Sequence, residues 1–119
     1  MKLKDSLYKI ESQHDGVFEL LMLDGHPVYE GHFPGEPITP GVLTLAIVRE
    51  CASLLAEKEL QYSAVKNCRF SAMIRPTERL TLTINHTISD SGHQVAAEIT
   101  DKEGNLRLQL EATLTDCPR

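Results

Sequence analysis

The sequence predicts an α+β fold in which one long central helix is wrapped by an antiparallel β-sheet. Three observations support this class. An Asp-Gly pair at residues 15–16 joins residues 7–13 to residues 17–23, and such a pair is a strong short-range signal for a β-hairpin. Residues 40–60 are apolar over a helical length, and the last third of the chain alternates apolar with polar residues, as half-buried strands do.

The helix should begin at Pro40, because proline suits the first helical position and Thr39 before it can act as a cap. Glu57 and Lys58 mark its solvated end. Its apolar residues cover most of the circumference, so we expect it to be buried and largely surrounded by the sheet.

Four further strands are expected after the helix. One should cover residues 63–74 and end near Arg75-Pro76. From Leu80 onwards the alternation has a period of two, with turn signals at residues 89–92 and 103–105. The last third is therefore a meander of three antiparallel strands.

The composition is that of one globular domain, and we treat residues 1–119 as a single unit. The chain has 41% hydrophobic and 24% charged residues and a net charge of −5, which argues against a nucleic-acid partner. Its apolar runs are much shorter than the roughly 20 residues that cross a bilayer, and the N-terminal residues do not resemble an export signal. We expect a soluble, cytoplasmic protein without a membrane partner.

No cofactor or metal is expected. Cys51, Cys68 and Cys117 have neither disulfide-framework nor zinc spacing. His26 lies six residues before His32, which matches no common ligand motif.

Three other histidines are expected to have structural or solvated positions. His86 falls on the apolar face of its strand, as a core or interface histidine would. His14 and His93 lie beside turns, so we expect both to be exposed.

The motif G-H-F-P-G-x-P-x-x-P-G-V at residues 31–42 carries the candidate chemistry. Its glycines allow close backbone approach or positive φ, and its prolines stiffen the loop that holds His32. A histidine titrates near pH ~6.5 and is a free base around neutrality. The first helical N–H groups, at Gly41 and Val42, lack intrahelical acceptors and can hold an oxyanion.

This motif, within HPVYEGHFPGEPITPGVL, and the later segment VKNCRFSAMIRPTERLTLTI resemble the hotdog-fold 3-hydroxyacyl-acyl-carrier-protein dehydratases. The resemblance covers most of the chain and implies a hotdog fold. It also implies that His32 is the catalytic base, that the Gly41 amide binds the thioester carbonyl, and that sites form between subunits.

The acid of this family is missing here. The family has Glu or Asp fourteen residues after the motif histidine, and this position is Ala46. Glu50, four residues further on, shares roughly the same helix face and is our candidate catalytic acid. The alternative is that Glu50 only pairs with a nearby basic residue: Arg49, Lys66 or Arg69.

The R-E-C sequence at residues 49–51 resembles a divergent dehydratase branch of aryl-polyene and flexirubin-type pigment pathways, in which conventional acids are missing. That resemblance would imply a polyunsaturated acyl chain on a carrier protein, with His32 acting as both base and acid.

Two further groups of residues are expected to bind the substrate and its carrier. Substrate contacts are expected at Phe33, Pro40, Val42 and Phe70. Because carrier proteins are acidic, a docking strip needs local positive charge. Candidates for it are Arg49, Lys66, Arg69, Arg75 and Arg79; the alternative is that these residues are a solvated strand edge.

Three functions remain open. The first is dehydration of a 3-hydroxyacyl thioester on acyl carrier protein by a homodimer or higher homo-oligomer, in fatty-acid or polyene-type biosynthesis. The second is a noncatalytic carrier-binding or heterodimer subunit, whose site another chain completes. The third is a hotdog thioesterase, which the intact GHFPG sequence disfavours because no water-activating carboxylate lies at the helix start.

Overall fold

The computed structural model describes residues 2–31, 35 and 37–118. Within them, six strands form one sheet in the order β1-β2-β4-β5-β6-β3, and every neighbouring pair is antiparallel. The α+β class is confirmed. The elements are β1 (Tyr8–His14), β2 (Val17–Met22), α1 (Val28–Gly31), α2 (Gly41–Ala56), β3 (Leu60–Phe70), β4 (Arg79–Ser89), β5 (Gly92–Asp101) and β6 (Leu106–Asp116).

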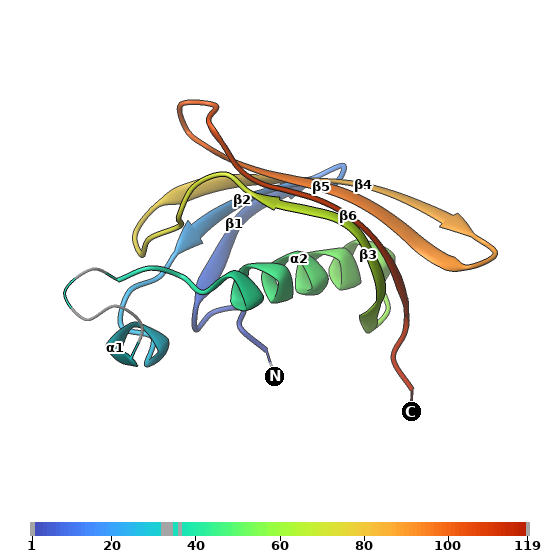
Figure 1. The fold of residues 1–119 in the computed structure, drawn as a ribbon, viewed down its shortest axis with the longest axis horizontal. Helices are drawn as coiled ribbons and strands as arrows, with labels where there is room; N and C mark the ends of the chain where they lie inside the picture. Colours follow the sequence, from blue (N-terminus) through green and yellow to red (C-terminus); the bar gives the residue numbers. More distant parts are fainter. Residues whose placement is uncertain (1, 32–34, 36, 119) are drawn as a thin grey trace.

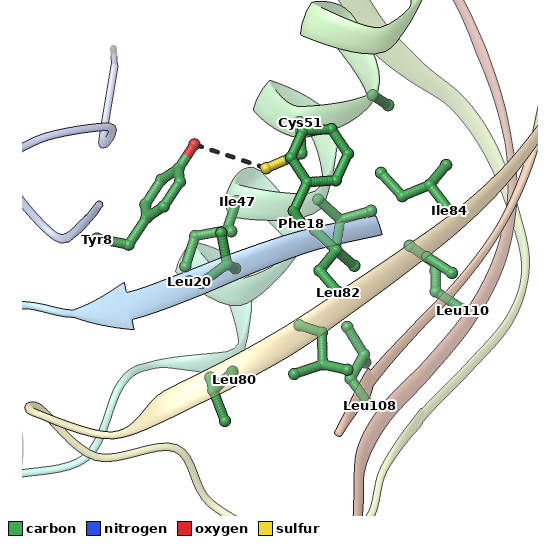
Figure 2. Close-up of a cluster of buried hydrophobic side chains, with 14 of the residues drawn as sticks. Tyr8, Phe18, Leu20, Ile47, Cys51, Leu80, Leu82, Ile84, Leu108 and Leu110 are labelled. Atoms are coloured by element: carbon green, nitrogen blue, oxygen red, sulfur yellow. Dashed lines mark hydrogen bonds between the residues drawn. The ribbon is translucent and has the colours of Figure 1, made fainter. Parts of the chain in front are cut away.

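The sheet arches over α2, which lies along its concave face (Figure 1). Alternate residues of each central strand point to the helix, as Leu80, Leu82 and Ile84 of β4 do. They meet Ile47 and Cys51 of α2 in a core of buried side chains (Figure 2). Each such apolar side chain contributes about 1.5–3 kcal/mol of burial free energy, so this packing fixes the position of the helix.

Helix α2 ends at Ala56, short of the predicted end. Glu57 adopts a left-handed conformation with φ of 57°. Its N–H donates to the Leu54 carbonyl at 3.3 Å, and the Lys58 N–H donates to the Ser53 carbonyl at 3.1 Å. This pair of bonds is a Schellman motif, and it turns the chain into β3.

Strand β3 also ends earlier than predicted, at Phe70. Two carbonyls of the following residues have partners other than the backbone N–H groups of a neighbouring strand. Met73 O accepts a hydrogen bond from the Arg107 side chain at 2.8 Å, and Ile74 O accepts one from Thr39 N at 2.7 Å. The chain therefore leaves the sheet and crosses to β4 through residues 71–78.

The sheet covers α2 less completely than predicted. Val42 is 74% exposed and Leu54 is 44% exposed. Leu43, Leu45 and Ala46 are only partly buried. One side of the helix, which the sequence predicts to be buried, is thus left uncovered within a single chain.

The histidines of β4 and β5 form a pair on the concave side of the sheet. His86 Nε2 and His93 Nδ1 are 2.8 Å apart, and His93 Nε2 lies 3.4 Å from Asp116 Oδ1. His93 is buried, so the expectation that it is exposed is wrong. The turn ends at Gly92, and His93 shares the core face of β5 with Val95.

We expect this pair to make stability depend on pH. Burial and the neighbouring His93 lower the pKa of His86. The unfolded chain, with a histidine pKa of about 6.5, therefore takes up protons first as pH falls. Stability is greatest above about pH 6.5 and is lost as pH falls through the lower folded pKa.

The melting temperature, measured by circular dichroism, should thus fall between about pH 7 and pH 5.5. His86→Gln should flatten this slope, whereas His14→Gln, at an exposed hairpin position, should keep it. An unchanged slope in His86→Gln would contradict the assignment.

Candidate active site

The first turn of α2 has two amides without acceptors. The Pro40 carbonyl accepts from Leu43 N at 3.0 Å and from Thr44 N at 3.2 Å. Among the described residues, no acceptor faces the N–H groups of Gly41 and Val42. They are the first donors of the helix and lie at the positive end of its dipole.

The expected capping role of Thr39 is wrong. Pro40 is the N-cap residue, and no side chain caps the helix. The Thr39 hydroxyl instead lies 2.8 Å from the Tyr29 hydroxyl. This bond ties α1 to the residues that lead into α2.

A cavity of ≈ 450 Å³ lies at the start of α2. Gly41 forms part of it, and the Phe70 ring packs so closely there that a Cβ on Gly41 would lie 3.1 Å from Phe70 Cζ. A larger residue at this position would require the Phe70 ring to shift by a few tenths of an ångström. The cavity is lined by Ile38, Thr39, Pro40, Gly41, Thr44, Phe70, Ser71, Ala72, Met73 and Ile74.

This arrangement can bind an apolar molecule that carries a carbonyl group. Two backbone donors at a helix N-terminus stabilise negative charge on an oxygen, and one preorganised donor is typically worth about 3–4 kcal/mol in a transition state. The apolar side chains around them can hold a hydrocarbon chain.

His32 and Phe33, two of the sequence-predicted residues, lie outside the described part of the chain. Tyr29 of α1 is bonded to Thr39, which lines the cavity. The role of His32 as base and the contact of Phe33 with substrate stay predictions.

The structure brings together three of the other predicted residues and separates Glu50 from them. Pro40, Gly41 and Phe70 line the same cavity, and Val42 is exposed in the first helical turn beside it. Glu50 lines a different cavity of ≈ 280 Å³, with Lys2, Lys4, Arg49, Ser53, Leu54 and Glu59.

Glu50 is buried, and its carboxylate accepts hydrogen bonds from three donors. Its Oε2 accepts from Leu3 N at 2.7 Å, and its Oε1 accepts from Lys4 N at 3.0 Å and from the Tyr8 hydroxyl at 2.8 Å. Arg49 Nη2 lies 3.7 Å from Oε2. Glu50 thus pairs with Arg49, and its role as proton donor stays a prediction.

The predicted docking residues do not form one continuous strip. Arg49 is partly buried on α2 and donates to the Leu60 carbonyl at 3.4 Å. Lys66 and Arg69 are exposed on β3, and Arg75 is exposed in the connection after it. Any carrier contact would therefore involve two separate regions.

The sequence did not predict that the residues after β3 form one wall of the cavity. Met73 and Ile74 line it, although residues up to 74 were predicted to continue the strand. The Arg75-Pro76 pair does signal a chain break, but nothing in the local pattern identifies the partners of the two preceding carbonyls.

The described residues do not support a metal site, a reactive cysteine or a membrane-spanning helix. No group of three or more His, Cys, Asp or Glu side chains there is placed to hold a metal ion. Burial raises the pKa of the Cys51 thiol to about 12, so it stays protonated near neutrality. No described helix has the length and apolarity to cross a membrane.

Comparison with known sequences identifies two kinds of relative. Residues 9–110 match the family model described as ApeI-like, ApeI dehydratase. A curated protein of Chloroflexus aggregans, named 3-hydroxyacyl-(acyl-carrier-protein) dehydratase FabZ, is 30% identical over 89 residues, covering 69% of this chain and 62% of the relative. The chain thus matches less than two thirds of that relative's length.

Solved structures share the fold at lower identity. The dehydratase heterocomplex ApeI:P from Xenorhabdus doucetiae aligns with a TM-score of 0.73 at 23% identity, covering 97% of this chain and 99% of that one. A hypothetical thioesterase with coenzyme A from Streptococcus pneumoniae aligns with a TM-score of 0.65 at 13% identity, covering 94% and 87%. These similarities confirm the hotdog fold.

The contacts of Glu50 predict a large structural effect on mutation. Glu50→Gln replaces one acceptor oxygen by an amide donor that faces other donors. We expect the free energy of unfolding to fall by about 1.5–3 kcal/mol, the range for a hydrogen bond to a charged group, as measured by urea denaturation. Glu59→Gln, at an exposed position of the same cavity, is the control. Equal stability of both variants would show that the Glu50 contacts are not stabilising.

Proposed function

Because the chain belongs to the ApeI-like dehydratase family, we propose that it dehydrates a 3-hydroxyacyl thioester on acyl carrier protein to the trans-2-enoyl thioester. The observation that carries the proposal is the pair of amides, at Gly41 and Val42, beside an apolar cavity at the start of α2. The curated relatives, which are named 3-hydroxyacyl-(acyl-carrier-protein) dehydratase FabZ, support the same substrate class.

In this reaction the Gly41 and Val42 amides hold the thioester carbonyl oxygen, on which negative charge grows. His32 removes the proton from the α-carbon, and the electron pair forms the α–β double bond. The bond from the β-carbon to its hydroxyl oxygen breaks, and the hydroxyl takes up a proton to leave as water. The acyl chain lies against Phe70 and the apolar wall.

The source of the last proton distinguishes two versions of this function. Ala46 cannot donate one, and both Glu50 oxygens already accept hydrogen bonds. In the first version, a homo-oligomer uses the His32 imidazolium, Glu50 or a bound water. Loss of turnover in folded Glu50→Gln would assign the proton to Glu50.

In the second version, this chain is one subunit of a heterodimer, and another chain supplies the acid. The alanine at the family's acid position favours it. The solved dehydratase heterocomplex with the same fold supports it further. A carrier-binding subunit without activity of its own is the limiting case of this version.

Both versions need a second subunit, and two surfaces could receive it. Strand β3 is at the edge of the sheet and has Val65 and Phe70 exposed at 48% each. The uncovered side of α2 includes Val42 and the partly buried Leu45. Pairing of β3 would remove an unpaired edge and bury apolar surface.

The carrier protein should approach through the exposed basic residues of β3 and the following connection, Lys66, Arg69 and Arg75, with Arg49 as a separate contact. Their positive charge would attract an acidic carrier to a protein whose net charge is −5. The similarity to the Streptococcus pneumoniae structure concerns the fold alone and adds no argument for thioester hydrolysis.

The proposal predicts an enoyl product that depends on His32. Mass spectrometry of a 3-hydroxyacyl carrier protein incubated with the purified chain should show loss of water. His32→Ala should lower the rate by about 10²–10⁴-fold, as expected for loss of a general base.

The matched control is His14→Ala, which removes an exposed hairpin histidine and should keep the wild-type rate. Product only after addition of a co-purified second subunit would favour the heterodimer. Release of free acid, or full activity of His32→Ala, would contradict the proposal.

A further inference from the structure

Residues 71–78, here called the wall, connect β3 to β4, and the first four of them line the cavity. Thr77 N donates to Met22 O at 2.8 Å, and Glu78 O accepts from Met22 N at 2.9 Å. The middle of the wall is bonded to the side chain of Arg107 of β6. Its Nη1 donates to Met73 O at 2.8 Å and to Glu78 Oε2 at 3.0 Å. Its Nη2 donates to Glu78 Oε1 at 2.6 Å and to Asp101 Oδ2 at 3.1 Å, and its Nε donates to the same Asp101 oxygen at 3.3 Å. All five N–H donors of the guanidinium are thus used.

This cluster is shielded from solvent and stays ionised. The side chains of Arg107 and Asp101 are 13% and 11% exposed, and that of Glu78 is 27% exposed. The hydrogen bond from Arg107 lowers the pKa of Glu78, and the same bond raises the pKa of Arg107. One cation therefore lies between two carboxylates, in the bidentate geometry that makes such pairs strong.

The cluster is connected to the wall at several points. Ser71 N donates to the Arg107 carbonyl at 2.9 Å, and Arg75 N donates to Glu78 Oε2 at 2.8 Å. Between these points lie Met73, whose carbonyl is bonded to the guanidinium, and Ile74, which also lines the cavity.

The wall is in turn bonded to the start of the helix. Thr39 N donates to the Ile74 carbonyl at 2.7 Å, and Thr39 is followed directly by Pro40 and Gly41. The guanidinium is therefore linked to the residues before the first turn of α2 through two hydrogen bonds in series, at Met73 O and at Ile74 O.

We propose that Arg107 is a positioning residue that sets the width of the acyl cavity and thereby the length of acyl chain it accepts. This inference rests on the proposed function. Arg107 itself does not line the cavity. It acts through Met73 and Ile74, whose side chains contact the part of the substrate that is remote from the reacting carbons.

The geometry requires arginine and not only a positive charge. Lysine has three donors on one rotating ammonium group, whereas the planar guanidinium bridges three acceptor groups in fixed directions. Arg107→Lys keeps the charge between Glu78 and Asp101 but cannot also hold the Met73 carbonyl. It is therefore the variant that separates positioning from charge.

The first measurement is steady-state kinetics with a short and a long 3-hydroxyacyl carrier protein. A wall that contacts the chain equally in the ground state and the transition state affects KM and not kcat. For Arg107→Lys we expect KM for the long chain to rise about tenfold, with kcat within about twofold and the short chain little changed. Glu78→Gln should give the same pattern.

The control is Lys102→Met, which removes a positive charge at the same end of the sheet and breaks an ion pair with Glu19, outside the wall. It should keep the wild-type KM for both chains. Equal changes of KM for both lengths, or a fall in kcat alone, would overturn the proposal.

A second measurement does not depend on activity. Hydrogen exchange by NMR should show that the amides of Thr39, Ser71 and Arg75 lose protection about tenfold in Arg107→Lys, while core amides of β4 keep theirs. A wild type that stays inactive even with its co-purified second subunit would refute the proposed dehydration and leave this result interpretable. Unchanged exchange at the three amides would refute the positioning role even if the enzyme is active.

Discussion

The packing of α2 against the concave face of the sheet is the constraint on which the rest of the structure depends. Ile47, Val48 and Cys51 are at most 1% exposed, so the helix can neither rotate nor slide without opening the core. This packing places the first helical turn against the end of β3, where Phe70 lies on Gly41. The Gly41 and Val42 amides, which have no acceptor among the described residues, thereby lie at or beside an apolar cavity whose position is set by the core.

Two charged side chains, the buried Glu50 and the partly buried Arg107, bind the segments that the core does not hold. Glu50 accepts three hydrogen bonds from the residues before and at the start of β1, and Arg107 donates five to the wall and the neighbouring strands. Each is fully hydrogen-bonded, as buried charges must be. Glu50 thus orders the N-terminal segment, and Arg107 orders the wall at the opposite end of the helix.

The sequence predicts those parts of the fold that depend on local patterns. The alternation of Leu80, Leu82 and Ile84 identifies β4, and the Asp-Gly pair identifies the first hairpin. Prediction failed where a residue adopts a backbone conformation that its type disfavours, and where contacts distant in the chain decide the structure. Glu57 ends the helix in a conformation more usual for glycine. Strand β3 ends where the carbonyls of the following residues are bonded to groups on other elements. The register of β5 places His93 in the core. Within the site, the sequence already predicts Pro40, Gly41 and Phe70 as substrate-binding or catalytic residues. It does not predict the wall residues, because Arg107, the side chain bonded to them, lies more than thirty residues further along the chain.

The central claim is that the amides at the start of α2 bind the carbonyl of an acyl thioester. The most direct measurement is ¹⁵N–¹H NMR of the protein titrated with a hydrolysis-resistant 3-hydroxyacyl pantetheine analogue. The account predicts that the Gly41 and Val42 amides shift together with those of residues 71–74. Shifts confined to the cavity around Glu50, or an unaffected Gly41 amide at saturation, would contradict it.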